Sequence, residues 1–365
     1  MASAPIHVSV SGRTDVGRTR DHNEDTFLVA DLSTGQVTIE PGLHERVAGD
    51  RGMLLMVADG MGGAAAGELA SALAAETIHA HLAATWSKES ESGGERFAFR
   101  MREAVEEANA RIHAYALEHT DVRGMGTTVT AAGVYGPDLY IAQIGDSRAY
   151  LVRQGQATLL TKDQSLTQRL VDAGELTEEE AERSERRNII LQALGPDPQV
   201  RVDLTHEPLR RGDLLILCSD GLSNQVKRED FSSLAASTPD LDALCAALIS
   251  VANERGGPDN ITVVAARFEG PGLPLGDVSE PPGHHVYALP GDAPLEEDFR
   301  TGYSTGEIRP ADRVGITYPA PASAVAAVAT DRAIPAPPVR RRLPVALLSS
   351  IIIGAAILLY FLLTR

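Results

Sequence analysis

The chain has 365 residues, enough for one large domain or two ordinary ones, so a mini-protein that needs staples to hold a core is excluded. Its 33 Lys and Arg residues against 50 Asp and Glu residues give a net charge of −17, which repels phosphates and argues against nucleic acid as a partner. Hydrophobic residues make up 43% of the chain, which excludes disorder of the whole, and the two cysteines, Cys218 and Cys245, are too few for a disulfide framework.

Residues 1–270 alternate segments typical of strands with segments typical of helices. Short apolar runs predict strands at 53–60, 213–221 and 261–268, and turn residues divide 127–161 into three runs, which predicts an antiparallel meander. Apolar residues at helical spacing predict helices at 67–86, 95–119, 166–173, 177–183 and 241–255. Because hairpin-linked strands outnumber βαβ units, we predict an α+β domain in which antiparallel sheet is covered by helices.

Residues 271–342 hold more than half of the 21 prolines and keep neither a strand period nor a helix period for long. Such a composition buries too little apolar surface to offset its ordering entropy, so we predict a disordered linker. The adjacent His284 and His285 lie in this linker, and no further ligand follows at a spacing that would suggest a metal site.

Residues 343–363 carry no charge, and as a helix they would be about 31 Å long, which matches the hydrocarbon core of a bilayer. Three arginines, 340–342, precede this stretch and one follows it, which favours a cytoplasmic location for the N-terminal part. The N-terminus lacks the pattern of a secretion signal. We therefore predict a single-pass protein of the cell membrane, with a transmembrane helix at 343–363 and the domain 1–270 in the cytoplasm.

Acidic residues recur where the apolar strands end. Asp59, Asp146 and Asp220 follow such runs, and Asp259 comes just before another. A single Asp after a strand is ordinarily a turn residue. Four of them on neighbouring strands would converge at one edge and repel one another unless a cation lay between them. Oxygen ligands without histidine or thiolate favour Mg²⁺ or Mn²⁺.

A further charged group stands near the N-terminus, in the sequence RDHNED at 20–25. Taken by itself, it is either a solvated turn or a functional segment. In the functional interpretation, Arg20 forks onto a phosphate and Glu24 adds another oxygen near a metal.

These segments belong to an ordered set of short motifs. The set resembles the metal-dependent protein phosphatases of type 2C, especially the bacterial serine/threonine phosphatases, over about residues 8–268. The motifs are RDHNED (20–25), VADGMGG (57–63), GMGTT (124–128), IGDSRAY (144–150), TKDQSLTQRLVDAGELTEEEA (161–181), CSDGLSN (218–224) and GGPDNITVV (256–264).

The resemblance implies a four-layer α-β-β-α sandwich with a centre of two Mg²⁺ or Mn²⁺ ions at one end. It implies that Asp59 bridges the two ions, that the Gly60 carbonyl binds one of them, and that Glu24 touches the same ion through water. Asp220 and Asp259 would hold the other ion. A water bridging the two ions would attack phosphoserine or phosphothreonine directly, without a covalent protein intermediate.

The same resemblance assigns supporting roles around this centre. Asp25 and Asn260 would orient the ligands, and Asp146 with Asp220 would bind a weaker third ion. Residues 161–187 would form a mobile flap beside it, and Arg20 would clamp the phosphate. The partners implied are phosphoserine and phosphothreonine proteins and a cognate serine/threonine kinase.

Two positions depart from the family pattern. Met61 stands where animal members carry a histidine proposed as general acid, so the leaving group would take its proton from water at the metal centre or from another group. Ala64 stands where many bacterial members have histidine. A second hypothesis is a catalytically silent, membrane-tethered module that binds phosphoproteins, although such a module has no physical need to retain the full set of acids with Arg20.

Overall fold

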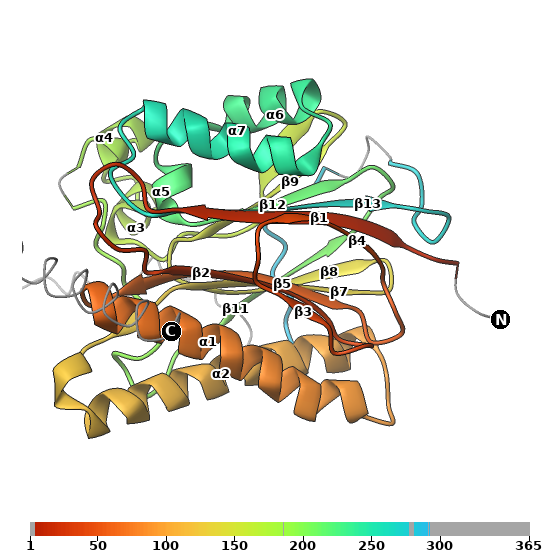
Figure 1. The fold of residues 1–365 in the computed structure, drawn as a ribbon, viewed down its shortest axis with the longest axis horizontal. Helices are drawn as coiled ribbons and strands as arrows, with labels where there is room; N and C mark the ends of the chain where they lie inside the picture. Colours follow the sequence, from red (N-terminus) through yellow and green to blue (C-terminus); the bar gives the residue numbers. More distant parts are fainter. Residues whose placement is uncertain (1–3, 185, 277–280, 291, 293–365) are drawn as a thin grey trace, which may run out of the picture. The chain divides into compact units, whose positions relative to one another are not determined.

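The computed structural model describes residues 4–184, 186–276, 281–290 and 292. These residues belong to one compact unit. Its centre consists of two packed β-sheets, in which every pair of neighbouring strands is antiparallel (Figure 1).

The first sheet has six strands. Their spatial order is β10 (Gln156–Leu159), β9 (Arg148–Arg153), β12 (Leu214–Cys218), β13 (Ile261–Glu269), β1 (His7–Asp15) and β4 (Gly42–Val47). The second sheet has seven strands, in the order β11 (Asp203–Pro208), β8 (Asp138–Ile144), β7 (Val129–Tyr135), β5 (Met53–Met61), β2 (Asp25–Asp31) and β3 (Val37–Thr38), with β6 (Gly126–Thr127) paired to the end of β5.

Helices cover the outer face of each sheet. The pair α1 (Ala64–Ala84) and α2 (Gly94–Glu118) packs on the seven-stranded sheet, and the pair α6 (Arg228–Ser237) and α7 (Leu241–Glu254) packs on the other (Figure 1). Two short 3₁₀ helices, Trp86–Lys88 and Thr120–Val122, follow α1 and α2. The predicted arrangement of two antiparallel sheets flanked by helices is therefore confirmed.

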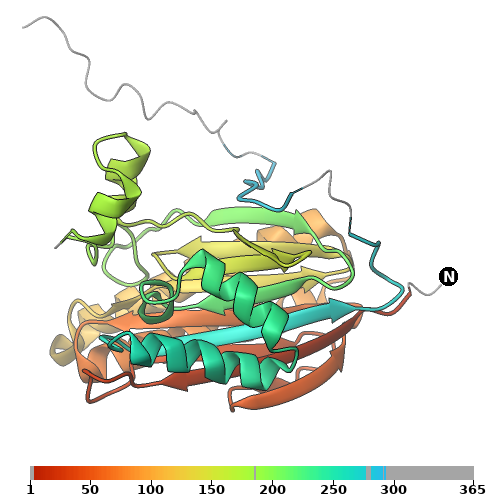
Figure 2. The ribbon, with the colours of Figure 1, turned by 90° about the horizontal axis from the view of Figure 1, so that it is seen from above.

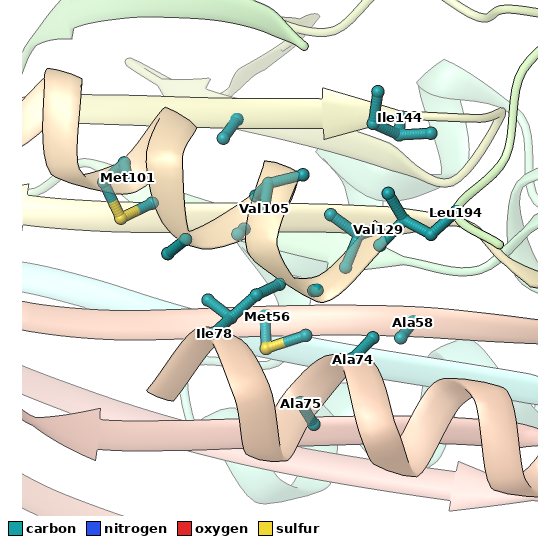
Figure 3. Close-up of a cluster of buried hydrophobic side chains, with 14 of the residues drawn as sticks. Met56, Ala58, Ala74, Ala75, Ile78, Met101, Val105, Val129, Ile144 and Leu194 are labelled. Carbon is teal, nitrogen blue, oxygen red and sulfur yellow. The ribbon is translucent and has the colours of Figure 1, made fainter. Parts of the chain in front are cut away.

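Strand β5 shows why the layers form. Leu54, Met56 and Ala58 alternate with Met53, Leu55 and Val57, and all six side chains are buried. Successive strand residues point to opposite faces, so the first set packs under α1 and α2 and the second set packs between the sheets. Figure 3 shows Met56 and Ala58 beside Ala74, Ile78 and Val105 of these two helices.

Three shorter helices lie at one end of the sandwich, on the left in Figure 1: α3 (Leu166–Asp172), α4 (Glu178–Glu182) and α5 (Asp220–Ser223). Helix α4 begins with a capping box, in which Thr177 Oγ1 accepts a hydrogen bond from the Glu180 backbone N–H and the Glu180 carboxylate accepts one from the Thr177 backbone N–H. In Figure 2, α3 and α4, drawn in yellow-green, stand out from the body of the sandwich.

The described part of the predicted linker is bound to the sandwich. The Tyr287 N–H donates to the Leu204 carbonyl (2.7 Å) and the His206 N–H donates to the His285 carbonyl (2.9 Å), so this segment adds to the free edge of β11. The Leu289 side chain is 3% exposed in the core under α2. We call residues 281–290 and 292 the strap. Proline content could not predict this packing, because a strand edge binds the backbone of almost any extended segment.

The strap contains the two adjacent histidines noted in the sequence, and each of them lies beside a carboxylate of β11. His284 Nε2 lies 2.7 Å from Asp203 Oδ2, and His285 Nδ1 lies 3.2 Å from Glu207 Oε2.

Within the described residues, no helix is both long enough and apolar enough to cross a bilayer. The predicted span at 343–363 lies outside those residues.

Candidate active site

The four strand-end aspartates and Asp25 come together at the end of the sandwich that carries α5. Asp25 begins β2 and lies directly opposite Asp59 of β5 in the antiparallel register. Asp146 follows β8, Asp220 begins α5 just after β12, and Asp259 precedes β13. Burial raises the pKa of the Asp59 carboxyl well above its usual range, and so do the charges of Asp25, Asp220, Asp146 and Asp259.

The surrounding carboxyls are perturbed in the same direction. Burial raises the pKa of Asp25 to about 7, against hydrogen bonds from Thr262 and Ser219 that lower it. Burial and the charge of Asp220 raise the pKa of Asp146 to about 8. The pKa of Asp220 is raised by burial and by Asp259. The site thus concentrates more negative charge than it can hold without protons or a cation.

Arg20 lies at the mouth of this site. Its Nη2 donates to Asp259 Oδ2 at 2.9 Å, and half of its side chain (51%) is exposed. A small pocket of about 90 Å³ is lined by Arg20, Asp220 and Asp259, and also by Arg187 and Asn188 at the end of the flap. Arg20, the predicted phosphate-binding residue, therefore lines the same pocket as Asp220 and Asp259, two of the predicted metal ligands.

Asn260 joins three segments behind the acids. Its Oδ1 accepts from the Glu24 backbone N–H (2.8 Å), while its Nδ2 donates to the carbonyls of Val16 (3.0 Å) and His22 (2.8 Å). These bonds hold the 20–25 segment against the loop before β13. The supporting role of Asn260 stays a prediction.

Gly60 allows a close approach that any side chain would prevent. A Cβ atom there would lie 2.1 Å from the Gly67 carbonyl oxygen and 2.6 Å from that of Glu24. A Cβ atom at Gly67, in the first turn of α1, would lie 1.9 Å from Glu24 Oε2. These two glycines let the end of β5, the beginning of α1 and Glu24 meet.

Sequence reasoning missed the hydroxyl groups that fix the acids. Ser219 Oγ donates to Asp25 Oδ2 (2.8 Å), and Thr128 Oγ1 accepts from the Asp59 backbone N–H (3.1 Å). Ser71 Oγ donates to the Glu24 carbonyl (2.7 Å). Ser219 and Thr128 lie inside motifs quoted above, which was a usable signal, but Ser71 lies mid-helix and no local pattern marks it.

The donor set fits a hard divalent cation. In the described part of the chain, no three His, Cys, Asp or Glu side chains are arranged so that they already enclose an ion. Arg20 instead pairs with Asp259. However, the buried Oδ1 atoms of Asp25 and Asp146 have no hydrogen-bond partner among the described residues. All the side-chain atoms available as metal ligands are oxygens, which Mg²⁺ and Mn²⁺ prefer. The ligand set Glu24, Asp59, Gly60, Asp146, Asp220 and Asp259 stays a prediction.

Comparison with known proteins decides the family. The model of a family described as protein phosphatase 2C matches residues 43–257. The chain belongs to the protein phosphatase 2C family. As a member of this family, it is a metal-dependent serine/threonine protein phosphatase that acts on phosphoproteins.

Relatives of this 2C phosphatase are bacterial. The serine/threonine phosphatase stp of Listeria welshimeri is 37% identical over 253 residues, which cover 69% of this chain and 92% of that protein. The structure of the Streptococcus agalactiae serine/threonine phosphatase is 35% identical with a TM-score of 0.63, over 71% of this chain and 99% of that one. The catalytic domain of the phosphatase PstP, solved with two manganese ions, is 37% identical with a TM-score of 0.59, over 72% of this chain and 99% of that one.

Proposed function

We propose that this phosphatase hydrolyses phosphoserine and phosphothreonine at a centre of two Mn²⁺ or Mg²⁺ ions, on the cytoplasmic side of a membrane to which its C-terminal segment tethers it. The observation that carries the catalytic part is the group of buried carboxyls around Asp59, each with a raised pKa. Burying so many acids together is unfavourable unless they bind a cation. The similarity to a catalytic domain solved with two manganese ions supports this assignment.

The two ions would be held by one backbone carbonyl, that of Gly60, and by the side chains of Glu24, Asp59, Asp220 and Asp259. When bound, the ions would supply the Lewis acidity that lets a water molecule, rather than a side chain, attack phosphorus. The surrounding residues position the oxygen ligands. Asp25 and Asp59 face each other in the strand register, the Ser219 hydroxyl donates to Asp25, and the Asn260 amide oxygen accepts from the Glu24 backbone N–H.

Arg20 would bind the substrate phosphate. Its guanidinium lies at the mouth of the pocket and already binds a carboxylate, Asp259, through Nη2. A phosphate dianion presents oxygens that the same fork can accept, and the negative charge that spreads over them during transfer strengthens the contact.

A nucleophilic cysteine is not available to this chain. Cys218 and Cys245 are both fully buried, and burial raises the pKa of each thiol to about 12. Neither cysteine is followed by an arginine six positions later, since Asn224 and Val251 occupy those positions. These residues therefore argue against a phosphocysteine intermediate.

The catalytic test is hydrolysis of a phosphothreonine peptide by the full-length chain with Mn²⁺, with and without a chelator. We expect Asp59→Asn to lose at least about 1,000-fold in turnover, because removal of a bridging ligand should cost several kcal/mol. Asp242→Asn, which changes a carboxylate at the start of α7 that pairs with Arg13 of β1, is the matched control. If Asp59→Asn kept more than about a tenth of the activity, the role of Asp59 would be wrong. If the wild type bound the peptide without hydrolysing it, the silent phosphoprotein-binding module would be the better description.

The tether is supported by the uncharged stretch at 343–363 and the arginines before it. It would keep the enzyme near phosphoproteins of the membrane, and the partner it requires is a serine/threonine kinase that makes its substrates. We expect the full chain to sediment with membranes and to resist extraction by carbonate. A chain ending at 342 should be released, and recovery of both forms in the soluble fraction would refute the tether.

A further inference from the structure

The loop that leads into the flap is fastened to the turn that carries Asp146. The Gln164 N–H donates to the Gly145 carbonyl (3.0 Å), and the Gly145 N–H donates to Gln164 Oε1 (2.9 Å). The chain returning from the flap joins the same residue, because Leu191 N–H donates to the Gln164 carbonyl (2.7 Å) and Gln192 Nε2 donates to Gln164 Oε1 (3.0 Å). The entering end of the flap is thereby bonded to Gly145, the residue before Asp146, and the returning end is bonded to Gln164.

An ion pair makes a second connection between the same two segments. Arg148 Nε lies 3.1 Å from each carboxylate oxygen of Asp163, and Nη2 donates to Asp163 Oδ2 at 2.6 Å. Arg148 Nη1 donates to the Tyr150 hydroxyl (3.2 Å), which fixes the guanidinium plane from the other side. Asp163 is only 8% exposed, so this fork is held rigidly and is little screened by solvent.

Arg148 lies close in the sheet to both predicted ligands of the third ion. It lies two residues after Asp146 on the chain, and in the sheet it is the register partner of Cys218, two residues before Asp220. Asp146 itself is 7% exposed, and its Oδ1 has no hydrogen-bond partner within the described part of the chain. A buried carboxylate oxygen without a donor indicates a position where a cation can bind.

We propose that Asp163, acting through Arg148, is a positioning residue for Asp146 and Asp220, so that cation uptake by these two carboxylates is coupled to the attachment of the flap. The proposal rests on the ligand set of the proposed function. Asp163 does not touch the cation. It fixes the guanidinium of Arg148, which lies where the ends of β9 and β12 pair, and through Gln164 the same loop is bonded to the Asp146 turn. Loss of the Arg148–Asp163 ion pair should let the ends of β9 and β12 move. It should therefore weaken cation binding by Asp146 and Asp220 without removing either ligand.

The test is calorimetric binding of Mn²⁺ alone to the full-length chain. We expect Asp146→Asn to abolish one Mn²⁺ binding event and Asp163→Asn to weaken that event about tenfold or more. In the Asp146→Asn background, Asp163→Asn should change nothing further. Asp242→Asn is the matched control, since Asp242 forms the same kind of fork with Arg13, at 3.0 Å to Nε and 2.5 Å to Nη2, between α7 and β1. It should leave the Mn²⁺ binding isotherm unchanged even where it lowers the melting temperature.

Three outcomes would overturn the proposal. A wild-type isotherm for Asp163→Asn would show that the fork is only structural, and an equal loss in the Asp146→Asn background would show that it acts elsewhere. A wild-type isotherm for Asp146→Asn would instead remove the third-ion ligand assignment, and the proposal with it. Should Asp163→Asn not fold, Asp163→Glu keeps the charge but displaces the fork, and it must weaken the same binding event.

Discussion

Gly67→Ala is a sharp test of the site because two effects of known size act in opposite directions. Gly67 lies within α1, and replacing a helical glycine by alanine ordinarily stabilises a protein by about 0.5–1 kcal/mol. Here the new Cβ atom would lie 1.9 Å from Glu24 Oε2 and 2.9 Å from the Gly60 carbonyl carbon. The substitution should therefore displace the Glu24 carboxylate, which is the end of a flexible side chain, and also press on the Gly60 backbone, whose carbonyl is a predicted ligand of the same ion.

The size of the disturbance follows from the first distance. An ordinary contact of about 3.4 Å requires the Glu24 carboxylate to move by about 1.5 Å, whereas metal ligation tolerates errors of about 0.2 Å. Loss of a group in the outer part of a metal site typically costs about 10- to 100-fold in metal affinity. We therefore expect the Mn²⁺ concentration for half-maximal activity to rise by about that factor.

The assay is hydrolysis of an aryl phosphate as a function of Mn²⁺ concentration, together with the melting temperature of the metal-free protein. Gly93→Ala is the control, because a Cβ atom at Gly93 meets no atom within 4 Å. Glu24→Ala should reproduce the part of the effect that comes from Glu24, and the double variant should add only the part that comes from the Gly60 backbone. A Gly67→Ala variant with the wild-type Mn²⁺ dependence would show that Glu24 plays no part in metal binding.

Three further outcomes are expected. Arg20→Ala should reduce kcat/KM for an aryl phosphate about 10- to 100-fold, mainly through KM, because charged hydrogen bonds contribute about 1.5–3 kcal/mol; an unchanged KM would contradict phosphate binding by Arg20. The pKa values of Asp25 and Asp146 in the folded protein, about 7 and about 8, lie above the unfolded value of 3.8. The stability that these two groups contribute to the metal-free protein is therefore complete below pH about 4, and it is lost as the pH rises through 7 to 8. Since Mn²⁺ must displace these protons, the increase in melting temperature on adding Mn²⁺ should be larger at pH 8 than at pH 6, and the reverse trend would refute this reasoning. Leu289→Ala removes a buried strap side chain at a cost of about 2–4 kcal/mol, so amide hydrogen exchange in β11 should accelerate, and unchanged exchange there would show that the strap does not protect this edge.

The strap shows where sequence reasoning reached its limit. Its residues lie in a proline-rich stretch with no period, which is typical of a linker. The structure binds them because β11 is an edge strand with free backbone groups and because Leu289 enters a core made by helices far away in the chain. Neither the free edge nor the core is visible in the local sequence.

The site itself divides in the same way. Local patterns were sufficient for the strand-end acids, for the apolar run that forms β5 and for the helix that α4 forms, because side-chain periodicity and turn chemistry act over a few residues. Only the tertiary structure decided that Asp25 lies opposite Asp59, that Ser219 donates to a carboxylate 194 residues away, and that Asp163 holds the arginine beside Asp146. Those contacts depend on strand register and on the packing of one sheet against the other, which are properties of the whole domain rather than of any segment of its sequence.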